Sequence, residues 1–355
     1  MHFKNKATFC MALAGTALAF GPGEAAQAAS IGASYQVVAK YPLTGAEGWD
    51  YLSLDAKRNR LFVSRGRHVQ VMDTKTGKLV GEIADTDGVH GVAFVQDLKL
   101  GFTSNGKANT VTVFNLDTLA TVDTIKVSGV KPDFIFYEPA HKRIYTSNGG
   151  SASISVIDPA TRKEVATIDV GGVPEAIVSD KQGRNVFVNL EDKSELVKID
   201  TQAGKVVARW PMAACESPTG LAYDWKNERL FAVCHSATMM VVDARSGKIV
   251  TQVANGAYAD AASFDARERL VYSSNGEGSL TVVHQDTPDS YTVQAKVDTM
   301  KGAKTMALDP KTHRVYTVSA QFGPVPAATA ENPHPRAPIL ADTVTVLVAE
   351  PKAGK

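Results

Sequence analysis

The chain has 355 residues and a formal net charge of +1, with 38 basic and 37 acidic residues. This balance provides no excess of positive charge to attract nucleic acid or an anionic membrane surface, so neither is expected as a partner. The length alone would allow two domains, but internal repeats favour one.

Residues 1–29 have the pattern of a cleaved secretory signal peptide. Lys4 and Lys6 precede an apolar run from Ala7 to Phe20, and small residues follow with the cleavage pattern Ala-Gln-Ala at 26–28. The apolar run is too short to cross a bilayer, and no later run is long enough. We therefore expect a protein exported to the periplasm, without a membrane span. Its mature part carries 36 basic and 36 acidic residues.

Two cysteines, Cys215 and Cys234, remain after the expected cleavage. In an oxidising compartment a disulfide between them is the default interpretation, and two separate buried thiols are the alternative. The neighbouring His235 raises the possibility of a Cys234–His235 nucleophile, which a disulfide would exclude. The absence of a Cys-x-x-Cys pair argues against zinc ligation by cysteine and against covalently attached haem.

The mature chain consists of copies of one segment, spaced 40–44 residues apart. Each copy has a β-rich run, a polar break, an alternating strand that usually ends in Asp, a turn such as Thr-Lys-Thr-Gly-Lys (74–78), and another strand. Four short strands per repeat of this length are typical of a β-propeller blade. The predicted fold is therefore all-β, with one propeller domain over residues 30–350 and a C-terminal tail at 351–355.

Seven short runs predict the innermost strands, so we expect a seven-bladed β-propeller; the runs are 51–55, 91–95, 134–138, 176–180, 220–224, 261–265 and 305–309. The seventh copy ends after its third strand, near 342–350, whereas residues 34–43 precede the first copy as an isolated strand. We expect this N-terminal strand to complete the last blade and close the ring.

The stretch YTSNGGSASISVIDPATRKEVATIDVGGVPEAIVSD (145–180) resembles the forty-residue YVTN-type propeller repeat. The arrangement of copies is similar to that of periplasmic YncE-like proteins over essentially the whole mature chain. The resemblance implies the propeller fold but not the activity, because related propellers include lactonases and haem-containing domains.

The entry of each predicted inner strand carries one residue of a set that recurs at the repeat spacing. We expect these seven residues to encircle the channel mouth on one face, and we call them the collar: Asp50, His90, Asp133, Glu175, Thr219, Asp260 and Lys304. Salt bridges at a wet channel mouth would explain any one of them. Function is favoured for the whole set, since gathered carboxylates repel one another without a compensating partner. Gly91 and Gly220 are expected to leave the adjacent positions free of bulk.

A second set is expected on the same face, where the second strand of each blade ends: Arg65, Asn105, Asn148, Glu191, His235 and Asn275. The Ser-Asn-Gly triplets are interpreted as turn residues that tolerate positive φ. Glu191 and His235 break this pattern, so both join the collar as candidate ligand-binding residues. A proline-containing insertion, 321–341, interrupts blade seven on this face and is a candidate lid, docking loop or tolerated insertion.

Two functional hypotheses follow. The first is a propeller that binds a small ligand, a cation or a periplasmic protein at the collar face. The alternative is a metal-assisted, lactonase-like hydrolase or lyase, in which Asp50, His90 and Glu175 hold Ca²⁺ or another divalent cation. No nucleophile elbow, phosphate loop, dinucleotide fingerprint or His-Glu-x-x-His motif is present, and no catalytic residue can be assigned.

Overall fold

The computed structural model describes residues 35–329 and 332–352. The expected signal peptide lies outside the described residues, as does most of the expected tail. The chain divides into a unit of residues 1–30 and a unit of residues 31–355, and only the second unit contains described residues. Between residues 35 and 352, as far as they are described, no helix is long and apolar enough to span a membrane.

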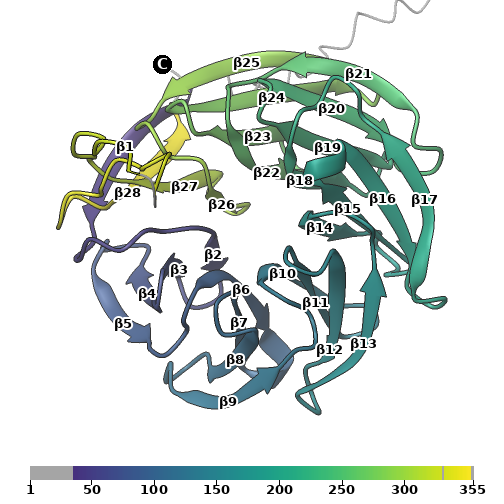
Figure 1. The fold of residues 1–355 in the computed structure, drawn as a ribbon. Coiled ribbons are helices and arrows are strands. Elements are labelled where there is room, and N and C mark those ends of the chain that lie inside the picture. Colours follow the sequence, from purple (N-terminus) through teal and green to yellow (C-terminus); the bar gives the residue numbers. More distant parts are fainter. Residues whose placement is uncertain (1–34, 330–331, 353–355) are drawn as a thin grey trace, which may run out of the picture. The chain divides into compact units, whose positions relative to one another are not determined.

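The second unit is an all-β, seven-bladed propeller, as predicted (Figure 1). Each blade is a four-stranded antiparallel sheet. From the inner to the outer strand, the first three blades are β2 (Leu52–Asp55), β3 (Arg60–Arg65), β4 (His68–Asp73) and β5 (Leu79–Ile83); β6 (Val89–Val95), β7 (Leu100–Asn105), β8 (Thr110–Asn115) and β9 (Thr121–Lys126); and β10 (Pro132–Glu138), β11 (Arg143–Asn148), β12 (Ser153–Asp158) and β13 (Lys163–Asp169).

The next three blades repeat this order. They are β14 (Pro174–Ser179), β15 (Asn185–Leu190), β16 (Glu195–Asp200) and β17 (Lys205–Pro211); β18 (Pro218–Asp224), β19 (Arg229–Cys234), β20 (Thr238–Asp243) and β21 (Ile249–Ala254); and β22 (Ala259–Asp265), β23 (Leu270–Asn275), β24 (Ser279–Thr287) and β25 (Ser290–Asp298). Two short 3₁₀ helices, Gln96–Leu98 and Glu191–Lys193, follow β6 and β15.

Blade seven contains strands from both ends of the described chain. Its order is β26 (Met306–Asp309), β27 (Arg314–Ser319), β28 (Thr345–Pro351) and β1 (Tyr35–Pro42). Strand β1 pairs antiparallel with β28 from Tyr35 opposite Pro351 to Pro42 opposite Thr345. The predicted closure by the N-terminal strand is therefore confirmed, although β28 extends one residue past the expected domain end at 350.

The aspartate at the end of a third strand closes the turn that follows it. Asp73 Oδ1 accepts hydrogen bonds from the backbone N–H groups of Lys75 and Thr76, at 3.0 and 2.8 Å. Gly77 then adopts a φ of +71°, which costs glycine little. Asp158 and Asp243 make the same contacts in their blades.

Hydrophobic side chains fill the spaces between neighbouring blades. Phe62 of blade one contacts Phe94 and Phe114 of blade two, with ring centroids 5.0 and 5.7 Å apart. The strands in the middle of a blade are buried on both faces for this reason, as in β4 and β8. Each blade is thus stabilised by burial of apolar surface against its neighbours.

The disulfide between Cys215 and Cys234 is present, as predicted. Cys234 ends β19 and lies opposite Pro218 of the inner strand β18, and Cys215 lies in the preceding loop. Both residues are fully buried. The bond therefore attaches the loop that enters the collar region to the second strand of blade five, and it leaves no Cys234 thiolate for a nucleophilic role.

Replacement of both cysteines, C215S/C234S, should lower the free energy of unfolding by about 3 kcal/mol, because the bond closes a loop across 19 residues. Chemical denaturation of the oxidised parent and the double variant measures the difference. Free thiols in the denatured, unreduced parent would contradict the assignment, as would equal stability of the two proteins.

Candidate functional site

Most collar residues lie at a bulge near the start of an inner strand. In β6 the pairing passes from Val89 opposite Asn105 directly to Val92 opposite Thr103, so that His90 and Gly91 face one residue, Ser104. The same irregularity occurs in β10, β14 and β18, and a shift also occurs in β22. Bulges of this kind redirect a side chain and are frequent beside functional sites. Here they occur where collar side chains enter the channel mouth.

Hydrogen bonds from the neighbouring blade hold the backbone of the collar. Ser147 donates to the carbonyl of Glu175 at 2.5 Å, and Ser274 donates to that of Lys304 at 2.6 Å. The same link joins Ser104 to Asp133, and Thr305 donates to the carbonyl of Asp50 across the seam at 2.6 Å. In blade four an asparagine amide, that of Asn189, replaces the hydroxyl and donates to Thr219.

These contacts correct the interpretation of the Ser-Asn-Gly triplets. The asparagines do not adopt positive φ; instead they are fully buried. Asn105 donates to the hydroxyls of Thr110 and Thr112, and Asn148 donates in the same way to Ser153 and Ser155. In each triplet the serine thus positions the next collar residue, and the asparagine connects the second and third strands.

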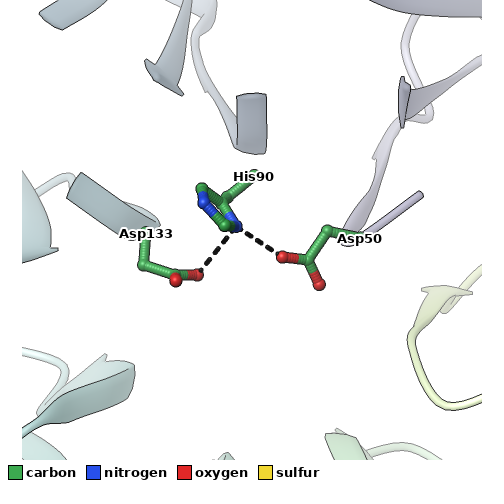
Figure 2. Close-up of side chains that lie close together, drawn as sticks. All are labelled: Asp50, His90 and Asp133. Carbon is green, nitrogen blue, oxygen red and sulfur yellow. Dashed lines mark hydrogen bonds and ion pairs between the residues drawn. The ribbon is translucent and has the colours of Figure 1, made fainter. Parts of the chain in front are cut away.

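His90 lies between two carboxylates contributed by the adjacent blades (Figure 2). Its Nδ1 atom is 2.6 Å from Oδ2 of Asp50 and 3.4 Å from Oδ1 of Asp133. One ligand atom from each of the three residues lies within 4.8 Å of the others. Their side chains are between 13% and 22% exposed, so the group is open to solvent on one side.

The other ring edge of His90 lies against Gly106. A β-carbon at position 106 would be 2.7 Å from Nε2 and 3.0 Å from Cδ2 of the imidazole. The equivalent glycine of blade three, Gly149, has its nearest neighbour 3.8 Å from the same point. The absence of a side chain at Gly106 therefore leaves room for the His90 ring in the orientation in which Nδ1 faces the carboxylates.

Lys304 and Asp260 form a separate ion pair in the collar, with Nζ and Oδ2 2.5 Å apart. Thr219 has a different role, because it is buried and its hydroxyl donates to the carbonyl of Ala259. The structure therefore brings the charged collar residues to the channel mouth but directs Thr219 into the contact between blades five and six.

Tyr51 was not singled out from the sequence, yet it reaches across the channel below the collar. Its hydroxyl donates to Oε2 of Glu175, three blades away, at 3.3 Å. Its ring packs edge-on against Phe134, with centroids 5.2 Å apart. Tyr51 is only 8% exposed, and it forms the floor of the collar. An aromatic residue directly after a collar position is the sequence signal that could have identified it.

Burial and crowding shift the proton affinities of the collar. Burial would lower the pKa of His90, but the hydrogen bond to Asp50 and the charge of Asp133 raise it above its ordinary value. Burial raises the pKa of Asp133 to about 6, with the Asp50 carboxylate adding to the effect and His90 opposing it. Burial, followed by the charges of Asp133 and Asp260, raises the pKa of Glu175 well above its ordinary value.

The two candidates from the second set directly follow the second strands of blades four and five. Glu191 begins the 3₁₀ helix after β15, and its charge contributes to the raised pKa of Glu175. The ring of His235 packs edge-on against Tyr258, with centroids 6.0 Å apart. Neither side chain forms a hydrogen bond or ion pair with a collar residue among the described residues.

The role of Gly220 also differs from the one expected from the sequence. A β-carbon there would lie 2.7 Å from the backbone of Ala261, so glycine permits the close approach of the inner strands of blades five and six. The described parts of the insertion, 321–329 and 332–341, lie at the edge of blade seven (Figure 1). Its Phe322 pairs with Ile339 and packs near Trp49, with ring centroids 6.1 Å apart.

Comparison with known proteins supports the fold and no finer classification. No family model matches the chain, and no curated protein matches it. Among solved structures, hydrazine synthase from Kuenenia stuttgartiensis aligns with a TM-score of 0.68 and 17% identity, over 84% of this chain and 97% of that chain. A chain from the crystal structure of the mitotic checkpoint complex aligns with a TM-score of 0.71 and 13% identity, over 94% and 98%. At this identity the likeness shows the propeller fold alone; the YncE-like family is not shown.

Replacement of Asp50 by asparagine should lower the pKa of His90 in chelator-treated protein, because the variant loses the charged acceptor that favours the imidazolium. The parent His90 should keep its proton to higher pH than D50N and lose the ion pair as pH rises through its raised pKa. Titration of the His90 ring by NMR measures this, with D97N at the opposite end of the propeller as a control. An unchanged His90 pKa in D50N would refute the contact.

Proposed function

We propose that the protein is an exported binding propeller whose collar takes a divalent metal ion at Asp50, His90 and Asp133. The observation that carries the proposal is the position of His90 Nδ1 between two carboxylate oxygens, at 2.6 and 3.4 Å. A cation in this position would replace the proton shared by these groups and neutralise the repulsion between the carboxylates.

The donor set favours a transition-metal ion over Ca²⁺. Imidazole nitrogen is a good ligand for Zn²⁺, Cu²⁺ and Fe²⁺, whereas Ca²⁺ prefers six to eight oxygens. Asp133 replaces Glu175 in the set suggested by the sequence, since Glu175 Oε2 accepts a hydrogen bond from Tyr51. Lys304 is held by Asp260, so its charge is partly compensated within the collar.

The periplasm remains the proposed location. A buried disulfide supports an oxidising compartment, and the sequence pattern of residues 1–29 supports export. The ligand would be a small molecule that completes the coordination of the metal, or a periplasmic partner that supplies such a group.

Metal-assisted hydrolysis is the second candidate. Three protein ligands with a solvent-open side are typical of metal sites that keep a position for water or substrate. Across the collar, Glu175 is a carboxyl group whose pKa is raised well above its ordinary value by burial. Hydrolysis of simple lactones or esters by the metal-loaded protein, lost in D133N, would favour this candidate over binding alone.

The chelated protein should bind one equivalent of Zn²⁺, with Mn²⁺ weaker and Ca²⁺ weakest. D50N, H90A and D133N should each weaken Zn²⁺ binding by roughly 100-fold or more, because changes even to groups behind the ligands cost 10- to 100-fold. Isothermal titration calorimetry measures the affinity, and elemental analysis of the purified parent measures the stoichiometry. Absence of Zn²⁺ and Mn²⁺ binding, or full affinity in all three variants, would exclude the site.

A pair of glycine variants provides a matched control. G106A should weaken Zn²⁺ binding, since its methyl group displaces the His90 ring, whereas G149A adds the same methyl group where space is available. Neither glycine has a positive φ, so alanine introduces no backbone strain at either position. Equal affinity in G106A and G149A would show that the orientation of His90 is unimportant.

A further inference from the structure

The propeller has a cavity at the end of the channel opposite the collar. Its volume is about 710 Å³, within the range of small-molecule sites. It is formed where the inner strands end, by the apolar side chains of Phe136, Val178, Tyr223, Phe264 and Leu308. All five are only partly buried in this structure. We call this cavity the lower mouth.

Trp225 is the most exposed aromatic side chain of the lower mouth, at 54%. Its indole Nε1 donates to the carbonyl of Ser179 at 2.8 Å, which attaches the ring of blade five to blade four. An indole held by a hydrogen bond while more than half of its surface meets water offers a fixed apolar surface to a ligand.

The lower mouth continues into the channel. Ala262, Ser263 and Leu308 line both the mouth and a channel cavity of about 310 Å³. Further along, the channel is lined by apolar residues such as Val92, Ile135 and Met306, and Tyr51 and Asp260 line its collar end. The two cavities together therefore form a continuous space that is mainly apolar at the lower mouth and becomes more polar towards Tyr51 and Asp260 at the collar.

The exposed charges of the lower mouth are positive. Lys181 and Lys226 both line it, and neither forms an ion pair with a described residue. The one acidic residue of the lining, Asp224, is buried, and its carboxylate accepts from the Lys226 N–H, the Asn227 side chain and Gln285. The turns after the seven inner strands carry ten lysines and arginines and four acidic residues, Asp97, Asp180, Glu228 and Glu268; these turns are residues 56–59, 96–99, 139–142, 180–184, 225–228, 266–269 and 310–313.

We propose that the lower mouth binds a small amphipathic anion, an aliphatic or aromatic monocarboxylate. Its apolar body lies on Trp225 and extends into the channel, and its carboxylate lies at the rim with Lys181 and Lys226. An apolar cavity favours burial of the hydrocarbon part, whereas the two unpaired ammonium groups select an anion over an alcohol or amine. This site is independent of the metal proposed at the collar.

The test uses the mature protein in EDTA, with octanoate and phenylbutyrate as probes. Calorimetry should detect one site per chain, with octanol and octylamine binding at least about tenfold more weakly than octanoate. K181Q/K226Q should lose about tenfold in affinity for octanoate. K57Q/K75Q, which removes two exposed lysines from turns at the same end but outside the cavity, should retain the parent affinity. Titration with octanoate should change the tryptophan fluorescence of W49F, which retains Trp225, but not that of W225F.

Three results would overturn the proposal: no binding of either carboxylate at millimolar concentration, equal binding of octanoate to the two double-lysine variants, or tighter binding of octylamine than octanoate. Sedimentation analysis of W225A adds a fourth. A change of oligomeric state on W225A, with octanoate affinity unchanged, would assign the lower mouth to self-association instead.

Discussion

The pairing of β1 with β28 is the contact on which the site depends, because only a closed ring brings the first and last collar positions together. Residues 43–49 connect β1 of blade seven to Asp50 of blade one. Thr305 of blade seven donates to the Asp50 carbonyl. Arg65 holds this connection in place, because it is fully buried and donates to the carbonyls of Thr44 and Glu47. The position of Asp50, and with it the proposed metal site, is thus physically linked to closure of the propeller.

Repeats made the fold predictable, since each copy supplied the same strands and one collar residue, and since an isolated first strand matched an incomplete last blade. The partners of each collar side chain were not predictable in this way. They depend on reach across the channel, as for Tyr51 and Glu175, and on the direction a bulge gives to a side chain, as for Thr219. The asparagines were misinterpreted because a triplet that resembles a turn is a buried hydrogen-bonding unit.

The two ends of the channel differ in chemistry because different parts of the same strands form them. The collar lies at the strand entries, where His90 lies between two carboxylates and Lys304 pairs with a third. The lower mouth lies at the strand exits, where aromatic side chains meet lysine-bearing turns. Tyr51 and Phe134 lie between the two ends. Binding at one end therefore does not require the chemistry of the other.

The neighbouring blades hold the collar residues by their backbone carbonyl groups, which are present whatever the side chain is. Ser147 would donate to residue 175 whether that residue carried glutamate, histidine or alanine, and Ser274 stands in the same relation to residue 304. Side chains at these positions can therefore be exchanged during evolution with little cost in stability. A lineage could acquire a new ligand by single substitutions in a fixed ring, which explains physically how one propeller architecture supports many unrelated binding chemistries.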